Sequence, residues 1–139
     1  MLDKNLISED IKKIQDLLKI VESFKEHTLE EIVNNFHLYG SLRYAFIELI
    51  GRAIDINQHL IKEGGADVPN DYTETFKILG KMDILEQEFA DEISKSVGMR
   101  NIVVHEYGEV DERLLYNSID IALDQYPKYC QKILDFIRQ

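Results

Sequence analysis

The sequence has few residues that interrupt helices or cross-link a chain. Its 139 residues include only two prolines and seven glycines, so long helices are expected. The one cysteine, Cys130, excludes an internal disulfide, and no Cys/His cluster has the spacing of a zinc site. We expect Cys130 to be a small packed residue. This cysteine usage fits a reducing compartment, and we expect a cytoplasmic protein.

Long apolar runs and excess positive charge are also missing. No stretch approaches the roughly 20 apolar residues of a membrane span, and the N-terminal residues lack the apolar centre of a signal peptide. We therefore expect no membrane association. The net charge of −10 excludes a broad basic surface for nucleic acid, so any RNA would have to bind in a local cationic cleft.

What the sequence does contain is apolar residues at helical spacing. Hydrophobic residues make up 45% and charged residues 30% of the chain, which is typical of a globular domain. There is no alternating strand pattern and no internal repeat. We predict one all-α domain over residues 1–139, folded as an antiparallel bundle of four to five main helices.

The first half of the chain predicts two long helices. Apolar residues at spacings of three and four predict a helix over residues 2–26. The capping box Thr28-Leu29-Glu30-Glu31 predicts a new helix start, and Asn34-Asn35 a break soon after it. The longest periodic stretch then continues to Glu63, where Gly64-Gly65 should end it.

Shorter helices are expected next. One should cover residues 71–79 and close at Gly80. Another should begin at about Asp83 and reach Gly98. Gly98 could end the regular helix there, or make room for a close neighbour. Periodicity does not decide between these two roles, because the following residues Ile102 to Val104 are continuously apolar.

The last part of the chain predicts a helix that begins after Asp111, a favoured N-cap. Tyr126-Pro127 should kink this helix or divide it before residues 128–138, because proline lacks the N–H that a helix interior uses. The apolar residues expected to face the core are Val110, Leu114, Leu115, Ile119, Ile121 and Leu123.

The segment Arg100-Asn101-Ile102-Val103-Val104-His105-Glu106-Tyr107 concentrates the side chains suited to chemistry on a phosphodiester. Arginine is a permanent, planar, five-donor cation that matches phosphate, and histidine exchanges protons near neutral pH. On a regular helix Arg100 and His105 would lie about 140° apart. They can converge if the helix bends after Gly98, or ends or tightens near Val104.

A purely structural role for these residues is the alternative. Arg100 and His105 could form a buried ion pair with Glu106 or Asp111, and His105 could cap a helix end. Two further arginines, Arg43 and Arg52, are nine positions apart and so on roughly opposite faces of one helix. We expect these two to be solvated or salt-bridged, since they cannot form one cationic patch.

The motif and its flanks resemble those of HepT-like toxins, the DUF86 branch of the HEPN superfamily. Arg100-Asn101-x-x-x-His105-x-Tyr107 is similar to their Arg-x4-His-x-Tyr signature, and Gly98-Met99 precedes it as in that family. The similarity extends to the long helix with Arg52-Ala53-Ile54-Asp55-Ile56-Asn57 and to the short helix ending in Phe76-Lys77-Ile78-Leu79-Gly80. It therefore covers most of the chain.

This resemblance implies a metal-independent endoribonuclease, without a cofactor, that acts on RNA as a homodimer. The motifs of two protomers would line one cleft. It implies catalytic roles for Arg100 and His105, with Asn101 in support. Arg100 would hold the phosphate, and His105 would transfer protons while the RNA 2′-OH serves as the nucleophile. The sequence does not assign His105 as acid or base.

The resemblance also implies a partner, an MNT-type nucleotidyltransferase that serves as the antitoxin of a type VII toxin–antitoxin system. In some systems this antitoxin attaches AMP to a tyrosine in the motif, and Tyr107 is the matching position here. The added charge and bulk would repel substrate phosphate. A packing role at a helix end is the alternative for Tyr107.

Two other functions remain open at this stage. The chain could be a non-catalytic helical partner or regulatory subunit of a nucleotidyltransferase, a role in which its acidic charge is easier to accommodate. A nucleotide-binding protein is a third possibility, which rests on HEPN kinship alone. RNA cleavage by the purified protein would distinguish the ribonuclease function from both of these alternatives.

Overall fold

The structure is a computed structural model that describes residues 1–105 and 111–139, with the backbone alone at Val104 and His105. Within these residues the chain is built from helices, with no strand. The all-α prediction is therefore confirmed. The helices are α1 (Lys4–Ser23), the short 3-10 helix η1 (Phe24–Glu26), α2 (Leu29–Val33), α3 (Phe36–Glu63), α4 (Tyr72–Lys81), α5 (Gln87–Ser94), α6 (Ser96–His105) and α7 (Glu112–Ile137).

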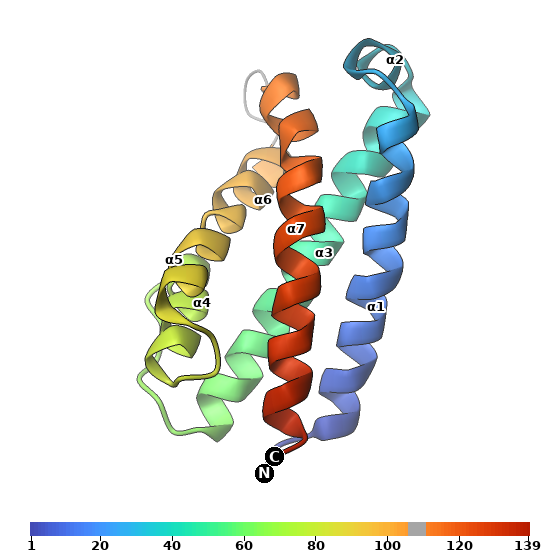
Figure 1. Ribbon diagram of the computed structural model, residues 1–139. Helices are drawn as coiled ribbons and strands as arrows, with labels where there is room; N and C mark the ends of the chain where they lie inside the picture. The colour runs from blue at the N-terminus through green and yellow to red at the C-terminus, as the bar shows by residue number, and fades with distance from the viewer. Residues whose placement is uncertain (106–110) are drawn as a thin grey trace.

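The long helices form an antiparallel bundle (Figure 1). α1 rises from the N-terminus, α3 descends beside it, α5 and α6 rise again, and α7 descends to a C-terminus close to the N-terminus. α1 packs along α3 and α7, while α3 also contacts α4 and α6. This up-and-down order is the predicted architecture. Across the described parts of the chain, none of the helices combines the length and the apolar character needed to span a bilayer.

The core lies between α1, α3 and α7. Ile14, Leu49 and Ile133, one from each of these helices, are fully buried. Burying one such side chain contributes roughly 1.5–3 kcal/mol, so the predicted apolar stripes carry the stability of the bundle. Cys130 is also buried, which confirms its predicted packing role.

Two glycine and loop predictions in the middle of the chain are wrong. Gly80 does not close the helix but lies inside α4, where an added Cβ would come within 2.9 Å of the end of the Gln87 side chain. Asp83 has a left-handed φ of 61°, which no α-helix accommodates. The next helix, α5, therefore begins at Gln87 and not at Asp83.

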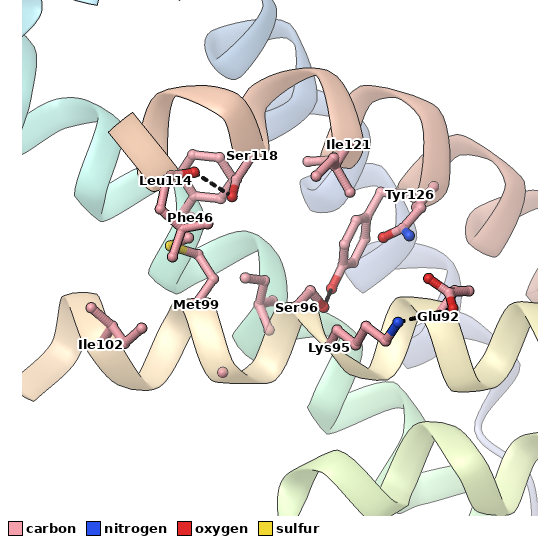
Figure 2. A pocket seen from close by; sticks show the side chains of 14 residues that line it. Phe46, Glu92, Lys95, Ser96, Met99, Ile102, Leu114, Ser118, Ile121 and Tyr126 are labelled. Carbon is pink, nitrogen blue, oxygen red and sulfur yellow. Dashed lines mark hydrogen bonds and ion pairs between the residues drawn. The ribbon is translucent and has the colours of Figure 1, made fainter. Parts of the chain in front are cut away.

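The interruption before the motif is at Lys95, not at Gly98. α5 ends at Ser94 and α6 begins at Ser96. The Ser96 hydroxyl donates to the carbonyl of Ile93 at 2.7 Å. It also hydrogen-bonds the hydroxyl of buried Tyr126 at 2.7 Å (Figure 2). Gly98 lies inside α6, and an added Cβ there would meet nothing within 4 Å. Neither predicted role of Gly98 is therefore correct.

Two predictions for α7 are corrected. Pro127 does not divide it into two helices, because the buried Tyr126 and Tyr129 hold it on the core on both sides of the proline. Leu114 and Ile121 do not face the core, and they remain 43% and 53% exposed. Both line an apolar groove of about 380 Å³ between α6 and α7 (Figure 2). Leu115 and Ile119 are buried as predicted, and Val110 lies outside the described residues.

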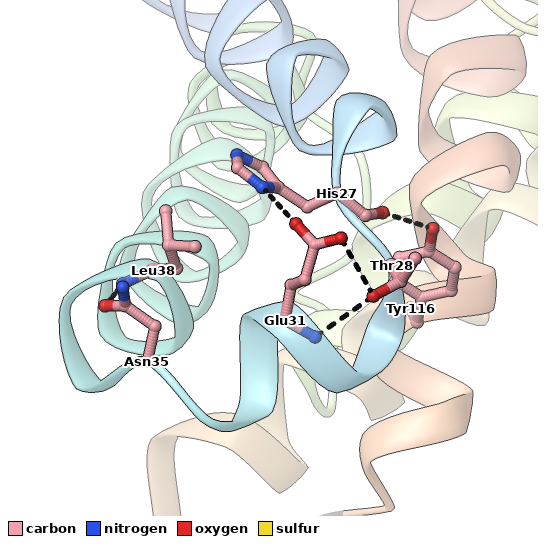
Figure 3. Close-up of polar contacts among 6 residues, drawn as sticks. All are labelled: His27, Thr28, Glu31, Asn35, Leu38 and Tyr116. Carbon is pink, nitrogen blue, oxygen red and sulfur yellow. Dashed lines mark hydrogen bonds and ion pairs between the residues drawn. The ribbon is translucent and has the colours of Figure 1, made fainter.

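The connection from α1 to α3 follows the sequence closely (Figure 3). The Thr28 hydroxyl accepts from the Glu31 N–H at 3.1 Å, which confirms the capping box. Glu31 also contacts His27 at 3.2 Å, and this contact lowers the pKa of the Glu31 carboxyl. Tyr116 on α7 donates to the carbonyl of His27 at 2.7 Å. Asn35 caps α3, as the predicted break requires.

Candidate active site

Arg100 lies in the middle of α6 and points toward α3 and α4. Its side chain is half-buried, and its Nε is a buried donor without a hydrogen-bond partner in the described residues. The guanidinium carbon lies 5.5 Å from the centre of the Tyr72 ring, within the range of a cation–π contact. The ring therefore restrains the guanidinium and leaves donors free for a ligand.

Arg100 lines a cleft of about 300 Å³, which we call the Arg100 cleft. Most of its wall comes from α3, because residues three and four apart share one face of a helix. Gly51 forms part of the floor, since a Cβ there would lie 4.0 Å from Arg100 Nε. The lining residues are Ile47, Glu48, Gly51, Arg52, Ile54, Asp55 and Gln58 of α3, Tyr72 of α4 and Arg100 of α6.

The two arginines of the cleft are in different states. Arg52 is bridged to buried Asp10 at 3.4 Å and to Glu48 at 3.7 Å, so its charge is compensated. Arg100 has no salt bridge to a described residue. Asp55 likewise makes no hydrogen bond or salt bridge within the described part of the chain. Desolvation and the nearby charge of Asp10 raise the pKa of the Asp55 carboxyl, although the positive charges of Arg52 and Arg100 oppose this shift.

The structure describes the other motif residues to different extents. Asn101 is exposed on α6. α6 is helical through His105, so positions 100 and 105 lie about 140° apart around it. The His105 side chain, Glu106 and Tyr107 lie outside the described residues. Asp111 caps α7, where its side chain accepts from the Leu114 N–H at 3.0 Å.

Arg43 and Arg52 stay separate, as predicted. Arg43 donates to the carbonyl of Val103 at 2.8 Å, and its guanidinium carbon lies 5.6 Å from the centre of the Tyr39 ring. It thereby ties α3 to the end of the motif helix. Arg52 forms the expected salt bridges instead.

Sequence reasoning missed three residues of the cleft. Glu48 and Asp55 lie on one face of α3 together with Arg52, and their spacings of four and three could have revealed this polar face. Tyr72 had no such signal. It comes from another helix, and only the folded structure places it against Arg100.

An antiparallel helical bundle whose helix before the last one carries Arg100 and His105 is the architecture of the HEPN class. The chain belongs to one family of that class, described as "Ribonuclease HepT-like", whose family model matches residues 7–133. The chain is thus a member of a ribonuclease family.

Individual relatives agree with this assignment. The chain is 31% identical over 133 residues to the tRNA nuclease HepT of Aphanizomenon flos-aquae, a match that covers 95% of this chain and 90% of the relative. It is 24% identical over 127 residues to the mRNA nuclease HepT of Shewanella oneidensis, covering 91% and 90% of the two chains. The fold also matches the tri-AMPylated Shewanella oneidensis HEPN toxin in complex with MNT antitoxin. That match has a TM-score of 0.86 and 21% identity, over 96% of this chain and 99% of the other.

Proposed function

We propose that this protein is a metal-independent endoribonuclease and the toxin of a type VII toxin–antitoxin pair in the cytoplasm. The observation that carries the proposal is Arg100, a motif arginine with a buried Nε donor that has no partner in the described residues. The terminal nitrogens of this guanidinium, which makes no salt bridge to a described residue, would donate charge-assisted hydrogen bonds to phosphate oxygens. Membership of a ribonuclease family supports RNA as the source of that phosphate.

The proposed reaction uses the nucleophile that RNA itself supplies. The 2′-oxygen attacks phosphorus, its proton passes to a base, and the bond from phosphorus to the 5′-oxygen breaks. The 5′-oxygen takes a proton, which leaves a 2′,3′-cyclic phosphate and a 5′-hydroxyl. His105 transfers one of these protons, a role typically worth about 10²–10⁴-fold in rate. Arg100 stabilises the charge that develops on the phosphate, and the exposed Asn101 contacts the substrate or His105.

We place the complete site in a homodimer. One copy offers one motif histidine, whereas the reaction moves two protons, and a second copy supplies the second histidine. The exposed apolar residues Ile102, Leu114 and Ile121 support such an interface, because they surround the groove between the motif helix α6 and α7. Burying this groove against another copy would remove its apolar surface from water.

The proposed antitoxin is an MNT-type nucleotidyltransferase that attaches AMP to Tyr107. An AMP group beside Arg100 and His105 would bring a negative charge to the place that the RNA phosphate occupies. The modification would therefore block the substrate without unfolding the bundle. The tri-AMPylated toxin among the structural neighbours supports this form of control.

The ribonuclease proposal is tested by RNA cleavage in EDTA. We expect the wild-type protein to cut RNA, and Arg100→Ala and His105→Ala each to lose at least about 10²-fold in rate. Arg138→Ala and His37→Ala are the matched controls, because both residues are exposed and lie outside the proposed site. Undiminished cleavage by Arg100→Ala and His105→Ala would overturn the catalytic assignment.

The modification is tested by intact-mass measurement after incubation with the nucleotidyltransferase and ATP. We expect added AMP on the wild-type protein and none on Tyr107→Phe. Tyr44→Phe is the control, since Tyr44 is 62% exposed and lies outside the motif. Modification of a protein that never cleaves RNA would instead favour the non-catalytic partner of a nucleotidyltransferase.

A further inference from the structure

The Arg100 cleft contains two hydrogen-bonding groups of opposite kind that the described residues leave unused. The Asp55 carboxylate can only accept, and it has no partner among the described residues. Arg100 Nε can only donate, and the described part of the chain offers it no acceptor. Arg100 Nε is buried, and the Asp55 carboxyl is exposed at the cleft, where partial desolvation raises its pKa. Together they favour a ligand that offers both a donor and an acceptor.

The charges in the cleft disfavour a bare anion as its occupant. Arg52 is neutralised by Asp10 and Glu48, and the carboxylates of Glu48 and Asp55 line the same wall. A phosphate placed against that wall would be repelled by both carboxylates. A neutral heterocycle with polar edges meets no such repulsion, and Arg100 can still offer its remaining donors to a phosphate outside the cleft.

The shape of the cleft favours a flat ring. Tyr72 is 45% exposed, so part of its ring is available for stacking on an unpaired base. The absence of a side chain at Gly51 keeps the floor beside Arg100 open. With about 300 Å³, the cleft has the volume of a small-molecule site and can admit one base.

Among the four RNA bases, guanine fits these groups best. Its N1–H and N2–H are adjacent donors that a carboxylate accepts together, and its O6 accepts from an arginine. Adenine and cytosine each offer one amino group beside an acceptor, which would face the Asp55 carboxylate unfavourably. Uracil offers a single N–H between two carbonyl groups.

We propose that the Arg100 cleft binds an unpaired guanine of the RNA beside the scissile phosphate, with Asp55 as the residue that selects this base. The proposal rests on the ribonuclease function proposed above. It adds a preference of the ribonuclease for guanine, and it assigns binding roles to Asp55 and Tyr72.

The test is to sequence the ends produced when the full-length protein cuts an RNA pool of random sequence. We expect guanine to be enriched at one fixed position relative to the cut, and Asp55→Asn to reduce that preference by about tenfold or more. Gly51→Leu, which fills the floor of the cleft, should reduce it as well. Asp67→Asn, the same change of charge in an exposed loop, should retain it. No base preference in the wild type, or the same preference in Asp55→Asn, overturns the proposal while the ribonuclease assignment stands.

A binding measurement keeps the cleft testable if no RNA is cut. In NMR titrations, guanosine 5′-monophosphate should shift the amide signals of Gly51 and Gln58 more than uridine 5′-monophosphate does at equal concentration. Asp55→Asn should abolish the difference. Equal shifts by both nucleotides would mean that only the phosphate or the sugar is recognised, and absent shifts would mean that the cleft binds neither base. Either result overturns the guanine proposal.

Discussion

A chain of buried side chains connects the core to the Arg100 cleft. The hydroxyl of fully buried Tyr129 donates to Asn57 Oδ1 at 2.6 Å, and Asn57 Nδ2 donates to Thr75 Oγ1 at 3.2 Å. Thr75 Oγ1 in turn donates to the carbonyl of Tyr72 at 2.6 Å. These bonds join α7, α3 and α4, and they end at the residue whose ring lies against Arg100. The network therefore fixes Tyr72 as well as the core.

We predict that Tyr129→Phe destabilises the protein by about 1–3 kcal/mol. The change keeps the ring but leaves the buried Asn57 oxygen without this donor, and an unsatisfied buried acceptor costs about that much. Urea unfolding would measure the loss. Tyr44→Phe is the control and should be neutral, because Tyr44 is 62% exposed. An equal stability of Tyr129→Phe and wild type would show that the network contributes nothing.

At the scale of single residues, the sequence could predict Arg100 but not its surroundings. Arginine and histidine stand out in a motif because of their chemistry. Asp55 and Tyr72 are ordinary residue types on two other helices. Only the fold brings both of them into the cleft with Arg100, and the Tyr72 ring lies 5.5 Å from the guanidinium carbon. Local spacing in the sequence contains no information about such tertiary contacts.

The motif helix α6 presents two different surfaces. Arg100 lines the polar Arg100 cleft against α3, whereas Ile102 lines the apolar groove against α7. The break at Lys95 separates α6 from α5, so the motif helix can take its own direction between α3 and α7. One short helix thus serves both the proposed chemistry and the proposed dimer.

We predict that Ile121→Glu shifts the protein from dimer to monomer. The change places a charge in the apolar groove that the second copy is proposed to bury, and an unpaired charge there is costly. Light scattering after size-exclusion chromatography would give the mass. Ile20→Glu is the matched control, because Ile20 is an isoleucine of similar exposure, 43%, on α1. A dimer that survives Ile121→Glu would exclude this groove as the interface.

Element boundaries were predictable where a side chain or a glycine fixes the backbone locally. Thr28, Asn35 and Asp111 cap the helices as expected, and Gly65 takes the positive φ of 70° that follows α3. The predictions failed where packing decides. Pro127 does not divide α7, because its buried neighbours hold both halves on the core, and Gly98 has no structural partner that would make it a boundary.

The whole molecule buries several weak acids in their neutral form. Burial raises the pKa of the Cys130 thiol from 9.0 to about 12. Burial likewise raises the pKa of the Tyr126 and Tyr129 hydroxyls above their ordinary value of 10.0. These groups keep their protons in the folded state at a pH where the unfolded chain loses them. The free energy of unfolding therefore depends on pH in the alkaline range.

We predict that the free energy of unfolding falls as the pH rises above about 9. Below that pH the thiol is protonated in both states, so the stabilisation is fully present. Between pH 9.0 and about 12 only the unfolded thiol ionises, and stability is lost by up to about 1.4 kcal/mol per pH unit for one group. Urea midpoints at about pH 8 and pH 10.5 would measure the loss, and Cys130→Ala should reduce its slope. An unchanged midpoint over this range would contradict the burial of these acids.

The central claim, metal-independent cleavage through the RNA 2′-OH, is tested most directly by the ends of the product. An RNA that carries one ribonucleotide among 2′-O-methyl nucleotides would be incubated with the full-length protein in EDTA, beside the same strand with a deoxynucleotide at that position. We predict that the first strand is cut after the ribonucleotide to give a 2′,3′-cyclic phosphate and that the second remains intact. Cutting of the deoxy-substituted strand, or cleavage that appears only when Mg²⁺ is added, would contradict the claim.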